Sequence, residues 1–212
     1  MSDIIRNQLA PNGVLRAAVN MGNPLLVTGT AANGDPQGVS PDMAAAVAAS
    51  LGVELKLVPY PSPGVLADGM NENAWDIGMI AVEPARAETI AFTAPYVQIE
   101  ATYLVRADSP FKTVEDVDSA GTKIAISARS AYDLYLIRSL KHAELVRAEG
   151  IAGSVDLFDT QHLPALAGLR PALLADQGRF PDSRVLDGKF TTVQQAVGCD
   201  PAKTEAAQYL SD

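Results

Sequence analysis

The chain has 212 residues, of which 48% are hydrophobic and 19% are charged, so it can bury one large core or two smaller ones. The net charge of −9 disfavours nucleic acid as a partner, because an acidic surface repels phosphate. One cysteine and two histidines exclude an internal disulfide and a multi-cysteine zinc site, and no apolar run reaches the ~18–20 residues of a membrane helix.

The first half of the chain alternates predicted strands and helices. Residues 26–39 look like a hairpin, strands are predicted at 14–19, 53–60 and 75–82, and helices at 40–52, 63–70 and from Pro84 onward. In the first helix we expect Ser40 to be the N-cap, Pro41 the first helical residue and Gly52 the end. This order is typical of a mostly parallel α/β sheet.

The second half repeats the alternation without a flexible linker. Strands are predicted at 101–108, 122–127, 155–159, 171–176 and 184–198. A helix is predicted at 130–145, and residues 163–169 look helix-like. A short helix is expected to start at Ser109-Pro110, and a final helix at Pro201. The last strand needs a sheet, and in a two-lobed protein it returns to the first lobe. We therefore expect lobe 1 at 1–103 plus 192–212, lobe 2 at 104–191, and a cleft crossed by hinge strands.

The segment EPARAETIAFTAPY, residues 83–96, places Arg86 in the first turn of a helix started by Pro84. A cation is disfavoured there by about 0.3–1 kcal/mol, because the helix dipole is positive at that end. A guanidinium and free N–H groups pointing the same way form a receptor for an anion. The alternative is that Arg86 pairs with Glu83 or another acid, or reaches solvent.

These residues carry a family resemblance. A strand (75–82), a Pro-x-Arg helix start and the segment Phe92-Thr93-Ala94-Pro95-Tyr96 resemble the type II periplasmic solute-binding proteins of ABC importers, in particular the amino-acid-binding family. The resemblance covers residues 15–198, although Pro84 and Arg86 stand one residue closer than in the common pattern. It implies an α/β fold of two lobes, each a mixed, mostly parallel sheet flanked by helices, with the ligand cleft between the lobes.

The same resemblance implies which residues hold the ligand. Arg86 is expected to grip a carboxylate, together with Ser130 after the strand at 122–127. Arg129 stands where glycine is common, which adds a second cation but casts doubt on a close backbone approach. Ser130 with Asp133 also fits a capping box that needs no ligand.

An acid after a strand of the second lobe usually holds the ammonium group of an amino-acid ligand. The predicted strand at 171–176 places Asp176 there, although Asp is also an ordinary turn or cap residue. Glu100, near the expected hinge, contacts a ligand cation or forms a salt bridge across the hinge. Tyr60 and Trp75 supply an aromatic wall or pack in the core.

The first loop, residues 20–25, lacks the aromatic pair of many relatives, and the run from Asp76 to Arg86 is short. An α-amino acid is therefore only one candidate ligand, and other small carboxylates are equally credible. We expect no cofactor and no metal, an ABC importer permease as partner, no membrane span, and a monomer.

Two alternatives to import remain. One is an enzyme resembling cyclohexadienyl dehydratase, in which burial would raise the pKa of Glu100 or Asp176 for proton transfer. The other is a cytoplasmic ligand-sensing domain. The resemblance implies the periplasm, yet residues 1–20 lack the features of a signal peptide, so either the protein stays in the cytoplasm or an export signal has been removed. The final helix is still running at Asp212, so we also expect a truncation or a tail that packs differently.

Overall fold

A computed structural model describes residues 3–212, and the chain divides into two compact units. Unit 1 comprises Met1–Val97 and Gln194–Asp212, and unit 2 comprises Gln98–Val193. The chain passes between the units twice, in strands β7 (Val97–Arg106) and β12 (Thr191–Cys199). The boundaries predicted from the sequence, after residues 103 and 191, lie within these same two strands.

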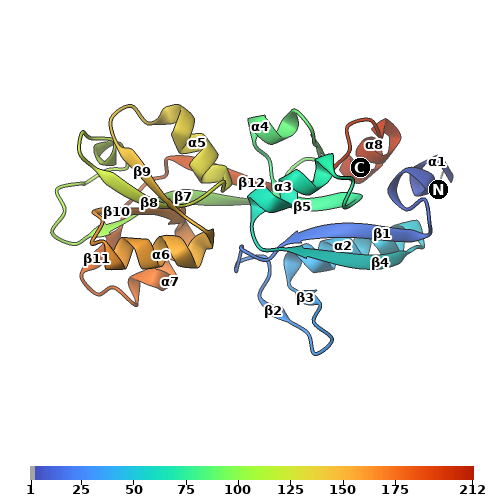
Figure 1. Cartoon of the computed structure of the whole chain (residues 1–212), viewed down its shortest axis with the longest axis horizontal. Coiled ribbons are helices and arrows are strands. Elements are labelled where there is room, and N and C mark those ends of the chain that lie inside the picture. The colour runs from blue at the N-terminus through green and yellow to red at the C-terminus, as the bar shows by residue number, and fades with distance from the viewer. Residues whose placement is uncertain (1–2) are drawn as a thin grey trace. The chain divides into compact units, whose positions relative to one another are not determined.

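Unit 1 contains a mixed sheet with the strand order β4-β1-β5-β12, and β6 pairs with β12 (Figure 1). Its strands are β1 (Val14–Asn20), β4 (Glu54–Tyr60), β5 (Ile77–Ala81), β6 (Ala91–Phe92) and β12, with a separate hairpin of β2 (Gly29–Thr30) and β3 (Pro36–Gln37). Its helices are α1 (Asp3–Leu9), α2 (Val39–Leu51), α3 (Pro63–Asn71), α4 (Pro84–Ala87) and α8 (Thr204–Ser211). Strand β1 is parallel to β4 and β5, and β12 is antiparallel to β5.

Unit 2 has the strand order β7-β10-β8-β9, and β11 pairs with β7. The strands besides β7 are β8 (Lys123–Ser127), β9 (Glu144–Ala148), β10 (Ala165–Leu169) and β11 (Ser183–Val185). The helices are η1 (Glu115–Val117), α5 (Ala131–Ser139), α6 (Gly150–Thr160) and α7 (Arg170–Gln177). Strand β8 is parallel to β9 and β10, and β10 is antiparallel to β7.

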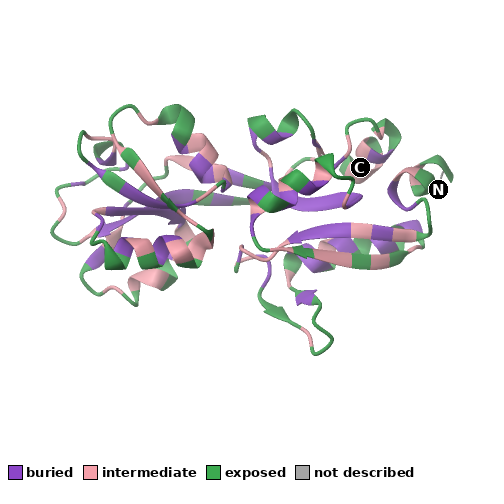
Figure 2. Ribbon diagram, viewed as in Figure 1, coloured by how far each residue is buried: buried purple, intermediate pink, exposed green. Residues whose placement is uncertain are grey.

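Both faces of the unit 1 sheet are covered, which explains why its strand β5 reads as a continuous apolar run. Successive side chains of a strand point to opposite faces. In β5, Ile77 and Met79 belong to a core cluster that includes residues of α1, α2 and α8, and Ile80 belongs to a second cluster with Leu66 of α3. The buried residues of each unit lie along its central strands (Figure 2).

The element order in the first half of the chain is confirmed, but the predicted cap of α2 is wrong. The N-cap is Gly38, not Ser40, and Gly52 ends the helix as predicted. Gly38 has φ 130°, and a Cβ there would lie 2.6 Å from the carbonyl oxygen of Leu26. Only glycine fits this backbone, so the helix begins earlier than the capping pattern indicates. The sequence analysis also missed α1.

Three elements of the second half were predicted with the wrong structure. The strand expected at 155–159 lies within helix α6, the helix-like piece at 163–169 contains strand β10, and the strand expected at 171–176 lies within helix α7. All five residues of β10 are buried, so its pattern shows no alternation that would distinguish strand from helix. In that strand Gly168 allows a close approach, because a Cβ there would lie 2.8 Å from Leu173 of α7.

The helix predicted at 130–145 ends early, at Ser139. The Asp118 carboxylate accepts hydrogen bonds from the backbone N–H groups of three successive residues, Lys141, His142 and Ala143, at 2.8–3.2 Å. These N–H groups turn away from the helix, and the chain continues as β9. Three smaller differences remain: the expected strand at 184–198 is two strands, the short helix expected at Ser109-Pro110 is the 3₁₀ turn η1, and the last helix begins at Thr204 rather than at Pro201.

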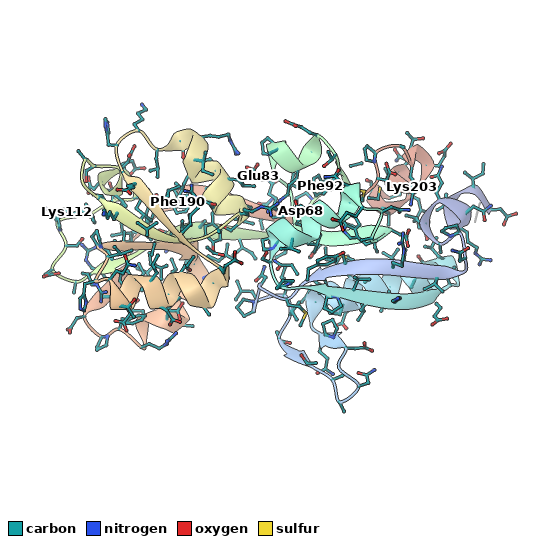
Figure 3. The ribbon with its side chains drawn as sticks, in the orientation of Figure 1. Asp68, Glu83, Phe92, Lys112, Phe190 and Lys203 are labelled. Carbon is teal, nitrogen blue, oxygen red and sulfur yellow. The ribbon has the colours of Figure 1, made fainter. Side chains whose placement is uncertain are left out.

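A buried carboxylate connects the start of β5 with β1 and with the beginning of α8. Asp76 is 2% exposed and accepts hydrogen bonds from the backbone N–H, Nε and Nη2 of Arg16 at 2.9–3.0 Å. Lys203, the N-cap residue of α8, which is labelled in Figure 3, places its Nζ 3.7 Å from the same carboxylate. Two cations and a backbone donor therefore compensate the burial of this charge.

We predict that Asp76→Ala lowers the free energy of unfolding by about 2–4 kcal/mol, because Lys203 and both the side chain and the backbone N–H of Arg16 lose the carboxylate that they share. Urea unfolding followed by circular dichroism measures this change. The control is Arg179→Ala, which removes an arginine that is 61% exposed and pairs with Asp176 at 3.4 Å. Its effect should stay within about 0.5 kcal/mol, and equal effects of the two substitutions would contradict the prediction.

Candidate functional site

In each unit the carboxyl ends of the parallel strands form the edge where open α/β sheets bind ligands. In unit 1 these ends are Asn20 of β1, Tyr60 of β4 and Ala81 of β5; in unit 2 they are Ser127 of β8, Ala148 of β9 and Leu169 of β10. Of the predicted ligand residues, Tyr60 and Arg86 belong to the unit 1 edge, whereas Arg129, Ser130 and Glu100 belong to the unit 2 edge. Asp176 belongs to neither.

Arg86 follows β5 and is buried, with 5% of its surface exposed. Its Nη1 donates a hydrogen bond to the carbonyl oxygen of Ala81, the last residue of β5, at 2.9 Å. The alternative in which this side chain reaches bulk solvent is therefore wrong. Helix α4 has only four residues, so the dipole that opposes Arg86 is smaller than the sequence analysis assumed.

Glu83 (labelled in Figure 3) is the N-cap residue of α4 and is also buried. Its Oε2 accepts a hydrogen bond from the backbone N–H of Ala85 at 3.3 Å, and Pro84 takes the first helical position as predicted. The edge of unit 1 therefore places a buried acid and a buried cation within one turn. Such a pair is stable in the core only when its charges and donors are satisfied, and among the described residues no buried side-chain nitrogen or oxygen lacks a hydrogen bond.

Ser130 is the N-cap of α5, and its Oγ accepts a hydrogen bond from the backbone N–H of Asp133 at 3.1 Å. The Asp133 carboxylate accepts in turn from the backbone N–H of Arg129 at 2.8 Å and from Nε of Arg147 at 3.0 Å. The capping interaction of Ser130 is therefore present. The second bond of the capping box comes to the Asp133 carboxylate from the backbone N–H of Arg129 instead of that of Ser130. Tyr132 hydrogen-bonds to the Ser130 side chain, and burial raises the pKa of this tyrosine to about 12.

Arg129 adopts a left-handed backbone with φ 57°, and its side chain is exposed. A left-handed conformation costs a residue with a Cβ roughly 1–2 kcal/mol relative to the right-handed one, whereas glycine adopts it freely. The structure thus gives the physical reason why glycine suits this position. The chain instead carries a strained arginine at the carboxyl end of β8.

Tyr60 and Trp75 contact the same core cluster of unit 1. Trp75 is fully buried and donates from Nε1 to the carbonyl oxygen of Leu66 at 2.9 Å, so its core interpretation is confirmed. Tyr60 is half-buried and packs against that cluster from the end of β4. Partial desolvation raises the pKa of Tyr60.

Glu100 is exposed on β7 and forms two ion pairs within unit 2. Its Oε2 lies 2.9 Å from Nε of Arg170, and its Oε1 lies 3.3 Å from Nζ of Lys189. The hydrogen bond from Arg170, followed by that from Lys189, lowers the pKa of the Glu100 carboxyl. Glu100 is therefore ionised at neutral pH, which is the opposite of the raised pKa that the dehydratase hypothesis requires.

Asp176 does not follow a strand, and this part of the sequence analysis is wrong. It lies in the last turn of α7, six residues after Arg170, so it is about 9 Å along the helix from Arg170. Its carboxylate pairs with Arg179. The residue that follows β10 is Arg170, which the sequence analysis missed because it predicted the strand in the wrong segment. The available signal was Arg-Pro after an apolar run, since Pro favours the first helical turn.

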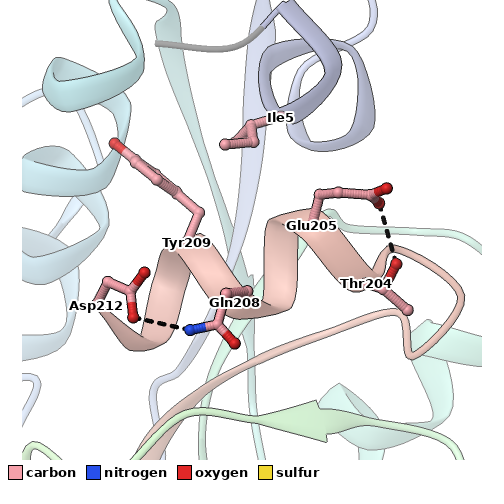
Figure 4. Close-up of a pocket in the computed structure, with 6 residues that line it drawn as sticks. All are labelled: Ile5, Thr204, Glu205, Gln208, Tyr209 and Asp212. Carbon is pink, nitrogen blue, oxygen red and sulfur yellow. Dashed lines mark hydrogen bonds between the residues drawn. The ribbon is translucent and has the colours of Figure 1, made fainter.

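A cavity of about 370 Å³ lies elsewhere in unit 1, between α8 and α1 (Figure 4). It is lined by Ile5, Thr204, Glu205, Gln208, Tyr209 and Asp212. None of the predicted ligand residues lines it. Its polar groups hydrogen-bond to one another or to neighbouring helices, for example Gln208 to Asp212 and Tyr209 to Ser50.

Residues 3–212 include no helix with both the length and the hydrophobicity of a membrane span. The same residues contain no group of three or more His, Cys, Asp or Glu side chains placed to hold a metal ion.

Residues 15–200 match the family model described as bacterial extracellular solute-binding proteins, family 3, so the chain belongs to this family. A curated relative is the cyclohexadienyl dehydratase of Pseudomonas aeruginosa. It is 27% identical over 189 residues, which cover 82% of this chain and 70% of the relative.

Solved protein structures share the fold of this chain. Holo ArgBP from T. maritima has a TM-score of 0.79 at 20% identity, covering 97% of this chain and 90% of that one. An amino acid ABC transporter substrate-binding protein from Streptococcus pneumoniae bound to L-arginine has a TM-score of 0.78 at 20% identity, covering 96% and 88%. These likenesses show the α/β fold of type II periplasmic binding proteins, as the sequence predicts.

We predict that Arg129→Gly raises the free energy of unfolding by about 1 kcal/mol, because glycine relieves the left-handed strain. Urea unfolding of the ligand-free protein measures the change. Lys123→Gly is the matched control, because it also replaces an exposed cation of the same segment but lies within β8, where glycine destabilises by roughly 0.5–1 kcal/mol. Destabilisation by both substitutions would contradict the strain at Arg129.

Proposed function

We propose that this family 3 solute-binding protein binds a small carboxylate-bearing ligand, an amino acid or a related organic acid, and delivers it to an ABC importer. The observation that carries the proposal is the burial of Arg86 at the carboxyl end of β5, in a segment that matches the family model. A buried guanidinium loses its hydration, so it interacts strongly with a carboxylate that replaces the lost water.

Arg86 supplies the principal contact to the ligand carboxylate in this proposal, and Ser130 and Arg129 of unit 2 supply further ones. Closure of the two units around the ligand follows the mechanism of binding proteins, in which the ligand binds the closed state more tightly and so shifts the equilibrium towards it. Tyr60, Glu100 and Asp176 have weaker support as ligand contacts. Tyr60 packs on the core cluster, Glu100 is paired with two cations, and Asp176 lies away from the strand ends.

The family description and the ABC transporter neighbours support a location outside the cytoplasm and a permease as partner. We therefore propose a periplasmic protein that acts as a monomer. A ligand-sensing domain in the cytoplasm is the alternative, and fractionation of cells that express the full-length gene product separates the two.

We predict that Arg86→Ala weakens binding of the ligand at least 10-fold, because each charge-assisted hydrogen bond contributes about 1.5–3 kcal/mol. A thermal-shift screen of amino acids, dicarboxylates and aromatic acids identifies the ligand, and titration calorimetry then gives the affinity. Arg86→Lys keeps the charge but loses the planar fork of donors, so its effect should be intermediate.

Each variant is compared with its own ligand-free melting temperature, because Arg86 also holds the carbonyl of Ala81 and its loss lowers stability. Arg179→Ala, which removes an exposed arginine, should leave the affinity unchanged. Unchanged affinity in Arg86→Ala would refute the proposal.

Dehydratase activity is a second candidate, since the curated relative at 27% identity is a cyclohexadienyl dehydratase. Glu100 is held in its ionised form and Asp176 lies away from the edge, so neither supplies the acid that this chemistry needs. We predict no turnover of prephenate or arogenate in an ultraviolet absorbance assay. Turnover that Glu100→Gln abolishes would overturn this conclusion.

A further inference from the structure

Two exposed Asn-Gly pairs lie in unit 1. Asn12-Gly13 precedes β1, and Asn33-Gly34 lies in the turn of the hairpin of β2 and β3 (Figure 1). An asparagine followed by glycine is prone to deamidation, because glycine has no Cβ to hinder attack of its backbone nitrogen on the asparagine side chain. Both glycines are open: apart from their chain neighbours, no atom lies within 4 Å of the position that a Cβ would occupy.

The backbones of the two pairs are alike. Gly13 has φ 76° and Gly34 has φ 90°. The N–H of each glycine donates at 2.9 Å to the carbonyl oxygen of the residue three positions earlier, from Gly13 to Ala10 and from Gly34 to Ala31. These hydrogen bonds restrain both attacking nitrogens in the same way. A difference in reactivity between the pairs therefore has to come from the asparagine side chains.

The side chains of Asn33 and Asn12 differ in their hydrogen bonds. Oδ1 of Asn33 accepts from the backbone N–H of Asp35 at 3.2 Å, and its Nδ2 donates to the Asp35 carboxylate at 2.7 Å. Within residues 3–212, no hydrogen bond holds the side chain of Asn12, which is exposed. Asn33 is thus fixed at both ends of its amide, whereas Asn12 samples its rotamers in solvent.

The hydrogen bond from the Asp35 N–H to Oδ1 of Asn33 closes an Asx turn, in which the side chain mimics part of a backbone turn. This ring folds Cγ of Asn33 over the backbone nitrogen of Gly34, the atom that attacks Cγ in deamidation. Holding two reacting atoms together lowers the barrier, because the entropy of orientation is already lost. The same N–H points at Oδ1, where negative charge develops as the new bond forms, and so stabilises that charge.

We propose that Asn33 is a site of spontaneous deamidation that the folded hairpin promotes. The Gly34 nitrogen gives its proton to water or hydroxide and forms a bond to Cγ of Asn33. The bond between Cγ and Nδ2 breaks, and Nδ2 takes up a proton from water and leaves as ammonia. Water then opens the resulting succinimide. Attack on Cγ gives aspartate, and attack on the backbone carbonyl carbon gives isoaspartate.

The test follows both pairs in one sample of the purified chain, at mildly alkaline pH and physiological temperature. Incubation in ¹⁸O-labelled water marks each newly formed carboxylate, and peptide mapping by mass spectrometry gives the two rates. In the folded protein we expect Asn33 to react about 10-fold faster than Asn12, because only Asn33 is held for attack. In guanidinium chloride the two rates should become about equal, since the unfolded chain keeps neither turn.

Substitution of Asp35 assigns the difference to its contacts with Asn33. Asp35→Glu keeps the negative charge and the backbone N–H but displaces the carboxylate from Nδ2. Loss of this one hydrogen bond should slow Asn33 about 3-fold and leave the rate of Asn12 unchanged. Asp42→Glu is the matched control, because Asp42 is an exposed acid of the same unit in the first turn of α2. It should leave both rates unchanged.

Three outcomes would overturn the inference. Asn12 could react as fast as Asn33 in the folded protein, which would show that the Asx turn promotes nothing. A preference for Asn33 that persists in guanidinium chloride would assign it to the local sequence instead of the fold. An unchanged rate of Asn33 in Asp35→Glu would remove Asp35 from the explanation. None of these measurements involves a ligand, so the proposed function is tested separately.

Discussion

Strands β1, β4 and β5 pair in parallel, as do β8, β9 and β10, and a parallel pair cannot be joined by a tight turn. In this chain the longer connections that such pairs need run through helices, and these begin where a strand has just ended. The N-caps Ser62, Glu83 and Ser130 and the helix start at Arg170 are consequences of this constraint. Polar side chains gather at the carboxyl ends of the strands because backbone N–H groups at helix starts need acceptors there.

Buried charge follows the same geometry, and in each case several donors compensate its desolvation. Asp76 at the start of β5 has Arg16 and Lys203, and Asp133 in the first turn of α5 has Arg147 and a backbone N–H. Burial of an isolated carboxylate would cost far more than the whole stability of a domain. These two acids therefore serve the fold and leave little capacity for a ligand. Arg86 is a buried cation at the end of β5, and its Nη1 donates to the carbonyl oxygen of Ala81.

The elements of the first half of the chain are predictable from its sequence because strong local signals coincide there. Pro63 and Pro84 mark two helix starts, Pro41 lies in the first turn of a third helix, and Gly52 marks a helix end. The second half lacks such signals. The five buried residues of β10 show no alternation. The segment 155–159, which contains Val155 and Phe158, is too short to show the helical spacing. The early end of α5 depends on the Asp118 carboxylate, which is far away in the sequence, and no local pattern reveals it.

The error in β10 shows how a mistake in secondary structure becomes a mistake in chemistry. With the strand placed at 171–176, the residue at the sheet edge is an acid, and the ligand of an acid at that position is an ammonium. With the strand at its actual position, the residue at the edge is Arg170, and Glu100 opposite it is needed to compensate that charge. A shift of a few residues therefore changes the residue that follows the strand from an acid, Asp176, to a base, Arg170. The chemical group that follows the strand at this edge therefore depends on where in the sequence this one strand lies.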